Sequence, residues 1–158
     1  MNFLQNEFHI RRLGKSDDTL FQQQVRLFRE VFGEESSGTA PAGYLEDLLG
    51  NPAFLAFAII HDQEVWGGAT AHILPLYYQA QTEVFLYDMA IHPKHQRKGL
   101  GIKLLSFLIV YCHQEGLGEV FVAADEKDTW ALNFYRAAGG TEERVLHFTY
   151  PVKSLRSE

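Results

Sequence analysis

Residues 84–91 are almost all apolar, and the chain runs from them through a basic, glycine-containing segment into a helical pattern at residues 102–115. A dense apolar run of this length is typical of a strand that is buried on both faces. The helical pattern repeats apolar side chains at the spacing of one helix face. The segment between the two, residues 92–101, contains Gly99 and Gly101. The chain is therefore predicted to leave a central strand through a tight turn and to enter a helix directly.

The first turn of that helix is predicted to bind an anion. Backbone N–H groups at the start of a helix have no partner within the helix and carry partial positive charge. Gly99 and Gly101 have no Cβ, so an anion can approach the main chain closely. Arg97 and Lys98 add formal charge beside these donors. We expect the turn to hold a phosphate or a diphosphate group.

Two common phosphate-binding patterns do not fit this turn. The pattern G-x-x-x-x-G-K-[ST] is absent, and G-x-G-x-x-G would need a third glycine where Leu104 stands. A pattern Gln-x-x-Gly-x-Gly, at Gln96, Gly99 and Gly101, remains, and it resembles the coenzyme A diphosphate loop of the GCN5-related N-acetyltransferase superfamily. The resemblance implies that acetyl-CoA binds to Met89, Ala90, Ile91, Gln96, Arg97, Lys98, Gly99, Leu100, Gly101, Ile102 and Lys103.

Length and composition are typical of one ordered globular domain, predicted to span residues 1–158. The sequence is 46% hydrophobic and 13% aromatic, which argues against a disordered chain. A net charge of −6 argues against nucleic acid as the main partner and is compatible with a cationic small molecule. No apolar run reaches the length of a membrane span, and the first residues lack the profile of a secretory leader. With the lone Cys112 fitting a reducing cytosol, a cytoplasmic protein is predicted.

Hydrophobic periodicity and turn residues predict the order β-α-α-β-β-β-α-β-α-β. Strands are predicted at residues 8–13, 53–61, 65–74, 84–91, 119–124 and 145–150, and helices at residues 17–32, 44–49, 102–115 and 128–138. Helices mixed with hairpin-linked strands indicate an α/β or α+β sandwich with a mixed sheet. The superfamily named above has the same order, and the resemblance implies its fold, a central, mostly antiparallel sheet flanked by helices.

Asp88 stands alone as an acid inside the apolar run. A carboxylate there is unfavourable unless it is hydrogen-bonded, paired or open to a cleft. Loss of water raises the pKa of a carboxyl group, which suits a general base. The alternative is a structural acid bonded to neighbouring backbone. Because the diphosphate turn follows closely in sequence, the interpretation of Asp88 as the catalytic base is favoured.

Tyr135 lies in a pattern that places Asp128, Ala131 and Tyr135 on one helix face. The pattern resembles the N-x-x-A-x-x-L-Y-x-x-x-G element of the superfamily. The resemblance implies that the Tyr135 hydroxyl lies near the coenzyme sulfur, where it serves as the catalytic acid, and that position 128 holds the pantetheine arm. Asp128 replaces the asparagine of that element, and a carboxylate cannot donate a hydrogen bond as an amide does. Asp128 is therefore either a coenzyme contact or a helix cap.

The histidines show no spacing typical of metal ligands, and no metal is predicted. His92 and His95 lie in the basic segment, where they could add charge. His72 and His147 lie on predicted strands that could border a cleft. Acetyl-CoA, as a co-substrate, is the only cofactor that we expect.

Further segments between about residue 21 and residue 150 resemble the type I aminoglycoside 3-N-acetyltransferases. They are Leu27-Phe28, Phe32-Gly33, Tyr44-Leu45, Leu48-Leu49, Gly67-Gly68, Leu74-Pro75, Tyr87-Asp88, Ala124-Asp125 and His147-Phe148. The resemblance implies acetylation of the 3-amino group on the deoxystreptamine ring of gentamicin-like antibiotics, and hence a role in antibiotic resistance. Residues predicted to bind this polycation are Asp88, Asp125, Glu126, Glu34 and Tyr44. Residues 33–43 have the length and composition of a mobile lid.

Other acceptors and other functions remain open from the sequence. With no good enzyme nucleophile in view, direct transfer within a ternary complex is predicted. The acceptor could instead be a polyamine, a small metabolite amine or a protein amine. A non-catalytic acyl-CoA sensor or a nucleotide-binding module would use the same turn, although the presence of both Asp88 and Tyr135 argues against a sensor. Superfamily members often pair, so the resemblance also implies a homodimer.

Overall fold

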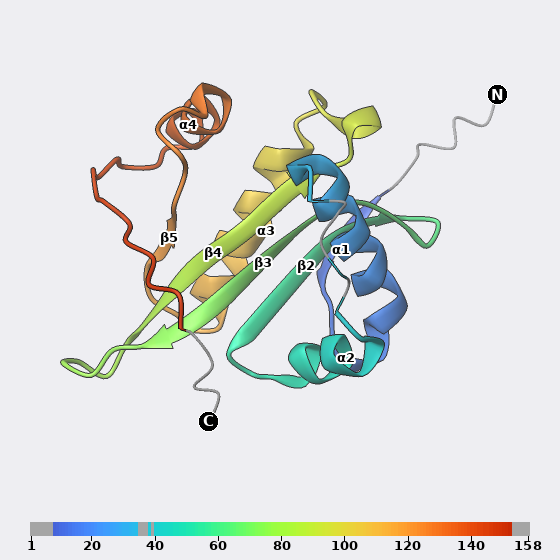
Figure 1. The fold of residues 1–158 in the computed structure, drawn as a ribbon, viewed down its shortest axis with the longest axis horizontal. Coiled ribbons are helices and arrows are strands. Elements are labelled where there is room, and N and C mark those ends of the chain that lie inside the picture. Colours follow the sequence, from blue (N-terminus) through green and yellow to red (C-terminus); the bar gives the residue numbers. More distant parts are fainter. Residues whose placement is uncertain (1–7, 35–37, 39, 153–158) are drawn as a thin grey trace, which may run out of the picture. The chain divides into compact units, whose positions relative to one another are not determined.

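Figure 1 shows the computed structural model, which describes residues 8–34, 38 and 40–152. The chain forms two compact units, residues 1–123 and residues 124–158. The first unit contains β1 (His9–Arg12), α1 (Asp18–Phe32), α2 (Ala42–Gly50), β2 (Phe54–His61), β3 (Glu64–Pro75), β4 (Thr82–Ile91), α3 (Leu100–Gln114) and β5 (Val120–Val122). The second unit contains α4 (Thr129–Ala137). A single domain over the whole chain stays a prediction.

The described strands form a five-stranded sheet in the order β1-β2-β3-β4-β5. Neighbouring strands are antiparallel from β1 to β4, and β5 runs parallel to β4. Short hairpin connections explain the antiparallel pairs β2–β3 and β3–β4, whereas β1 and β2 are joined through α1 and α2. The crossover through α3 is long enough for the parallel pair of β4 and β5. The predicted mixed, mostly antiparallel sheet flanked by helices is confirmed.

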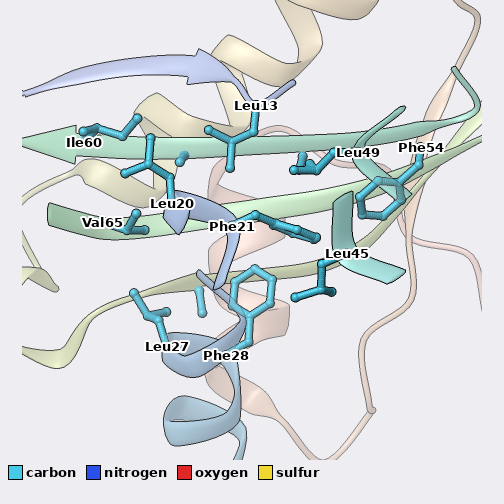
Figure 2. Packing of buried hydrophobic residues seen from close by; sticks show 13 residues of the cluster. Leu13, Leu20, Phe21, Leu27, Phe28, Leu45, Leu49, Phe54, Ile60 and Val65 are labelled. Carbon is cyan, nitrogen blue, oxygen red and sulfur yellow. The ribbon is translucent and has the colours of Figure 1, made fainter. Parts of the chain in front are cut away.

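The two faces of the sheet carry different helices (Figure 1). On one face, Phe21 of α1 and Leu45 of α2 join a buried cluster with Phe54 of β2, as Figure 2 shows. On the other face, the Phe57 ring meets Phe107 and Tyr111 of α3, with ring centroids 6.0 and 5.1 Å apart. Successive side chains of a strand point to opposite faces, so even-numbered β2 residues face α1 and α2 while Phe57 faces α3.

Helix α1 lies close against β3 because Gly68 leaves room for it. A Cβ at Gly68 would collide with the side chain of Gln24, which is fully buried. Gln24 Nε2 donates a hydrogen bond to the Ala69 carbonyl at 3.2 Å. This contact ties α1 to the centre of the sheet and directs its carboxyl end toward the second half of β4.

Strand β4 contains a bulge at Tyr87. Thr70 of β3 pairs with Asp88 and Ala71 pairs with Leu86, which leaves Tyr87 without a partner on β3. A bulge places two residues of one strand opposite one residue of its neighbour and changes where the following side chains point. The bulge therefore decides which face of the sheet Asp88 occupies.

The predicted strand at residues 145–150 is wrong. Residues 141–152 contain no strand, and Val145, Leu146, Phe148 and Tyr150 are exposed. The alternating pattern supplies the side chains of a strand, but a strand also needs a neighbour for its backbone hydrogen bonds. The predicted lid, residues 33–43, lies partly outside the described residues.

None of the described helices combines the length and the apolar character that crossing a membrane requires.

Candidate active site

The glycine turn, residues 96–101, connects the end of β4 to α3 as predicted. Arg97 and Gly99 adopt left-handed backbone conformations, with φ of 61° and 75°. Gly99 is the residue before the first helical turn, and α3 begins at Leu100 and runs for 15 residues. Two left-handed residues in close succession fold the chain sharply enough to start the helix directly behind the strand. The helix begins two residues earlier than the periodicity predicts.

Side chains at the start of the glycine turn and just before it hold this segment in place. Gln96 Nε2 donates to the Ile91 carbonyl at 2.9 Å, so Gln96 fastens the turn to the end of β4. His92 Nδ1 accepts from the Lys94 backbone N–H at 3.2 Å and caps a short 3-10 helix, Pro93–His95. Gln96 is predicted from the motif as a coenzyme contact, and its amide group acts here as a positioning group.

Trp66 of β3 supports the same segment, and sequence reasoning missed it. The Trp66 ring stacks on His95 with centroids 4.0 Å apart, and it also stacks on His61 with centroids 4.5 Å apart. The Trp66 carbonyl accepts a hydrogen bond from the His92 backbone N–H at 2.8 Å. Burial and the nearby Lys98 lower the pKa of His95. No local pattern signals this support because Trp66 and His95 lie on different segments of the chain.

The exposed side of the glycine turn suits an anion. Arg97, Lys98 and Gly99 are exposed, and a Cβ at Gly99 would meet nothing within 4 Å. The start of a 15-residue helix adds backbone donors and partial positive charge. Leu100 is buried, so only its backbone is available to a ligand, and the Lys103 ammonium lies over the Phe8 ring at 5.1 Å from the centroid. Open space, backbone donors and two cations together fit a diphosphate.

The edge of β4 next to the glycine turn suits an extended ligand. Strand β5 pairs with β4 only at Val84, Phe85 and Leu86. Residues 87–91 continue beyond β5, and of these residues 88–91 pair, among the described strands, with β3 alone. An unpaired strand edge can accept an elongated amide-containing group as an added strand. Met89, Ala90 and Ile91, predicted to hold the pantetheine arm of acetyl-CoA, lie on this edge, and the site fits that ligand.

Asp88 lies partly buried within this part of β4, one residue before Met89. Its pKa is raised, first by loss of water on burial and then by the negative charge of Glu34. Backbone N–H donors would lower the pKa of a carboxyl group. Loss of water therefore outweighs hydrogen bonding at this carboxyl group, and the assignment of Asp88 as the catalytic base stays a prediction.

The structure brings Glu34 near Asp88, two residues predicted separately to bind the acceptor. Gly33 ends α1 in a left-handed conformation, with φ of 70°, and the Glu34 backbone N–H donates to the Arg29 carbonyl at 2.9 Å. This helix end places the Glu34 charge close enough to raise the pKa of Asp88. Tyr44, also predicted to bind acceptor, lies exposed in the first turn of α2.

The second unit holds the remaining predicted residues. Asp128 Oδ1 accepts from the Ala131 backbone N–H at 2.9 Å, so Asp128 caps α4. Asp125 Oδ1 accepts from the Lys127 backbone N–H at 2.8 Å, and Glu126 is exposed. Tyr135 lies on α4, where its ring packs against Phe134 at a centroid distance of 5.1 Å. The coenzyme contact of Asp128 and the catalytic role of Tyr135 stay predictions.

The Cys112 thiol is poorly suited to act as a nucleophile, and no cluster of metal ligands is found among the described side chains. Burial raises the pKa of the Cys112 thiol inside α3, which disfavours the nucleophilic thiolate. Among the side chains that the structure describes, no three His, Cys, Asp or Glu residues lie together as a metal site would require. The absence of a metal requirement stays a prediction.

Solved structures of two aminoglycoside acetyltransferases are similar to this chain. One of them is the crystal structure of an aminoglycoside acetyltransferase, meta-AAC0020 from an uncultured soil metagenomic sample, in complex with sisomicin. Its sequence is 34% identical to this chain, the TM-score is 0.89, and the match covers 92% of this chain and 97% of that one. A second aminoglycoside acetyltransferase, HMB0005 from such a sample, is 28% identical, with a TM-score of 0.87, over 93% of this chain and 99% of that one.

A curated relative extends the range of acceptors among similar proteins. The [ribosomal protein bS18]-alanine N-acetyltransferase of Escherichia coli (strain K12) is 28% identical over 76 residues, 48% of this chain. The match spans about half the length of that enzyme, 51%. The sequence profile of the Acetyltransferase (GNAT) family matches residues 18–139. The chain thus belongs to the acetyltransferase (GNAT) family.

Proposed function

We propose that this acetyltransferase moves an acetyl group from acetyl-CoA to an amine of an aminoglycoside, at the 3-amino group of the deoxystreptamine ring. The observation that carries the proposal is Asp88, a carboxyl group of raised pKa beside a second carboxylate and next to an open strand edge. Two structurally similar aminoglycoside acetyltransferases support the substrate class. The 3-amino position rests on the resemblance of the motifs.

Asp88 serves as the general base in this proposal. An amine is protonated at neutral pH and must lose a proton before it can attack a carbonyl. Bound acetyl-CoA supplies the thioester that the free amine attacks. A carboxylate of raised pKa accepts the amine proton more readily than an ordinary aspartate does, either directly or through one water molecule.

The donor side depends mainly on the backbone. Residues 89–91 hold the pantetheine arm along the free edge of β4, and the glycine turn holds the diphosphate. A backbone N–H near Met89 or Ala90 stabilises negative charge on the carbonyl oxygen. Tyr135 donates a proton to the departing thiolate, as the resemblance implies.

The acceptor side depends on carboxylates. Asp88 meets the reacting amine, and Glu34 attracts a second amine of the same polycation. Tyr44, Asp125 and Glu126 contribute further acceptor contacts. The buried Cys112 thiol is a poor nucleophile, which supports direct transfer of the acetyl group within a ternary complex. The protein acts as a homodimer, as the resemblance implies.

Acetyl-CoA turnover tests the proposal. Purified protein is incubated with acetyl-CoA and gentamicin, spermidine or a peptide with an N-terminal alanine, and release of free thiol is followed. We expect thiol release with gentamicin, and NMR of the product to place the acetyl group on the 3-nitrogen. Turnover restricted to spermidine or the peptide would refute the proposal that the acceptor is an aminoglycoside. Acetylation of gentamicin at another nitrogen would refute only the proposed 3-amino position. A burst of acetyl-enzyme would refute direct transfer.

A further inference from the structure

Five aromatic rings, the aromatic row, cross the first unit from β2 to β5. Their centroids are separated by 5.3 Å between Phe54 and His72, 5.6 Å between His72 and Tyr87, and 5.5 Å between Tyr87 and Phe85. Phe121 of β5 stacks on Phe85 at 4.9 Å with the two ring planes almost parallel, at 3°. The row therefore connects the buried centre of the sheet with its β5 edge.

The bulge places this row on the same face as Asp88. Phe85 pairs with His72, and Asp88 pairs with Thr70. Because Thr70 and His72 are two residues apart on β3, they point to the same face, and so do their partners on β4. In a regular strand Phe85 and Asp88, three positions apart, would point to opposite faces. Because of the extra residue Tyr87, both lie on one face, and the Tyr87 ring joins them through its contacts with His72 and Phe85.

The row emerges from beneath α2 and becomes accessible. Phe54 is 5% exposed within the cluster of α1 and α2, whereas Tyr87 is 58% exposed and Phe121 is 40% exposed. The Tyr87 ring stands nearly perpendicular to its neighbours, at 80° to His72 and 73° to Phe85. An exposed tyrosine packed on two sides has little rotational freedom to lose when a ligand covers it.

We propose that Tyr87, supported by Phe85 and Phe121, binds an amino-sugar ring of the acceptor while Asp88 meets the reacting amine. This inference rests on the proposed function and specifies how the site selects its substrate. A sugar ring has an apolar C–H face and polar edges, and a tyrosine ring offers a flat surface with a negative face that attracts such hydrogens and nearby ammonium groups.

Charge complementarity argues for this occupant over another protein segment. Asp88 shares its face of the sheet with the row, and Glu34 lies near enough for its negative charge to raise the pKa of Asp88. Two negative charges in one place favour a cationic ligand there. An apolar protein segment laid on the row would bury these carboxylates without a partner, which is unfavourable. An amino sugar satisfies both requirements because its ring covers the aromatic surface and its amines pair with the acids.

Steady-state kinetics and calorimetry of Tyr87→Leu and Tyr87→Phe test the inference. Leucine keeps an apolar side chain without the aromatic face, and phenylalanine keeps the ring. We expect Tyr87→Leu to raise the KM for gentamicin roughly tenfold and to leave the KM for acetyl-CoA unchanged. Tyr87→Phe should have a KM for gentamicin close to that of the unaltered protein. Calorimetric titration of gentamicin into the coenzyme A complex should show the same weakening without turnover.

Tyr77→Leu is the matched control, because Tyr77 is 99% exposed in the connection between β3 and β4 and lies outside the row. An unchanged gentamicin KM in Tyr87→Leu, with the unaltered protein active on gentamicin, overturns this inference and leaves the proposed function standing. An unaltered protein that neither binds nor acetylates gentamicin overturns both. A change of oligomeric state in Tyr87→Leu, absent in Tyr77→Leu, shows that a second copy of the chain covers the ring, and also overturns the inference.

Discussion

The glycine turn and the aromatic row lie on either side of Asp88 along β4, and they are built from different parts of the chain. The turn offers backbone groups, two left-handed residues and a helix start within a few consecutive positions. The row offers side chains from β2, β3, β4 and β5 that meet only in the folded sheet. A ligand common to a whole family can be held by the backbone, whereas selection among acceptors depends on side chains.

Asp88 connects the two regions, and its removal has the largest expected effect. Asp88→Asn keeps the shape of the side chain but cannot accept the amine proton, so kcat should fall by roughly 10²–10⁴. The Kd for coenzyme A, measured by calorimetry, should stay unchanged because the glycine turn is intact. Asp62→Asn, in the exposed turn between β2 and β3, is the control. Unaltered turnover in Asp88→Asn would remove Asp88 from the mechanism.

The same variant should also be more stable at neutral pH. Since the pKa of Asp88 is raised in the folded state, its contribution to stability is present at low pH and is lost as pH rises through that pKa. Asp88→Asn should therefore melt at a higher temperature than the unaltered protein at pH 7 and lose this advantage on acidification. A lower melting temperature at pH 7 would contradict the raised pKa.

The glycine turn can be tested with the same substitution at two ends of one helix. Gly99 lies at the start of α3 with φ of 75°, and Gly116 lies just beyond the end of α3 with φ of 66°. A Cβ at either position would meet nothing within 4 Å. Alanine at each position introduces similar backbone strain, about 1–2 kcal/mol. We expect Gly99→Ala alone to raise the Kd for coenzyme A, by about tenfold. Equal effects of the two variants on Kd would show that the turn is only structural.

The smallest expected effect is a shift in pH dependence caused by Glu34. The charge of Glu34 raises the pKa of Asp88, so Glu34→Gln should lower that pKa. Activity needs the ionised carboxylate, and kcat/KM falls as pH drops through this pKa. The acid limb of the pH profile should therefore move to lower pH. Glu30→Gln, on the exposed side of α1, is the control and should leave the acid limb in place. An acid limb that does not move in Glu34→Gln would show that the charge of Glu34 does not affect the pKa of Asp88.

The glycine turn could be predicted from sequence because its determinants are local. The apolar strand, the motif at Gln96, Gly99 and Gly101, and the helical pattern follow one another directly. The mixed sheet could also be predicted, because hairpins and one long crossover leave few possible arrangements. Asp88 could be singled out because an acid is rare in an apolar strand.

The strand predicted at residues 145–150 shows the limit of local patterns, since alternation describes one strand and pairing needs two. The acceptor side shows the same limit. That Glu34 lies near Asp88 depends on where α1 ends and how closely it packs at Gly68. That Tyr87 shares a face with Asp88 depends on one extra residue in the pairing of β3 with β4.

The amino-acid sequence by itself determined the glycine turn, the strand before it and the acid within that strand, because each results from interactions among near neighbours. Only the tertiary structure decided which side chains surround that acid, because a single bulged residue changes the face on which they meet.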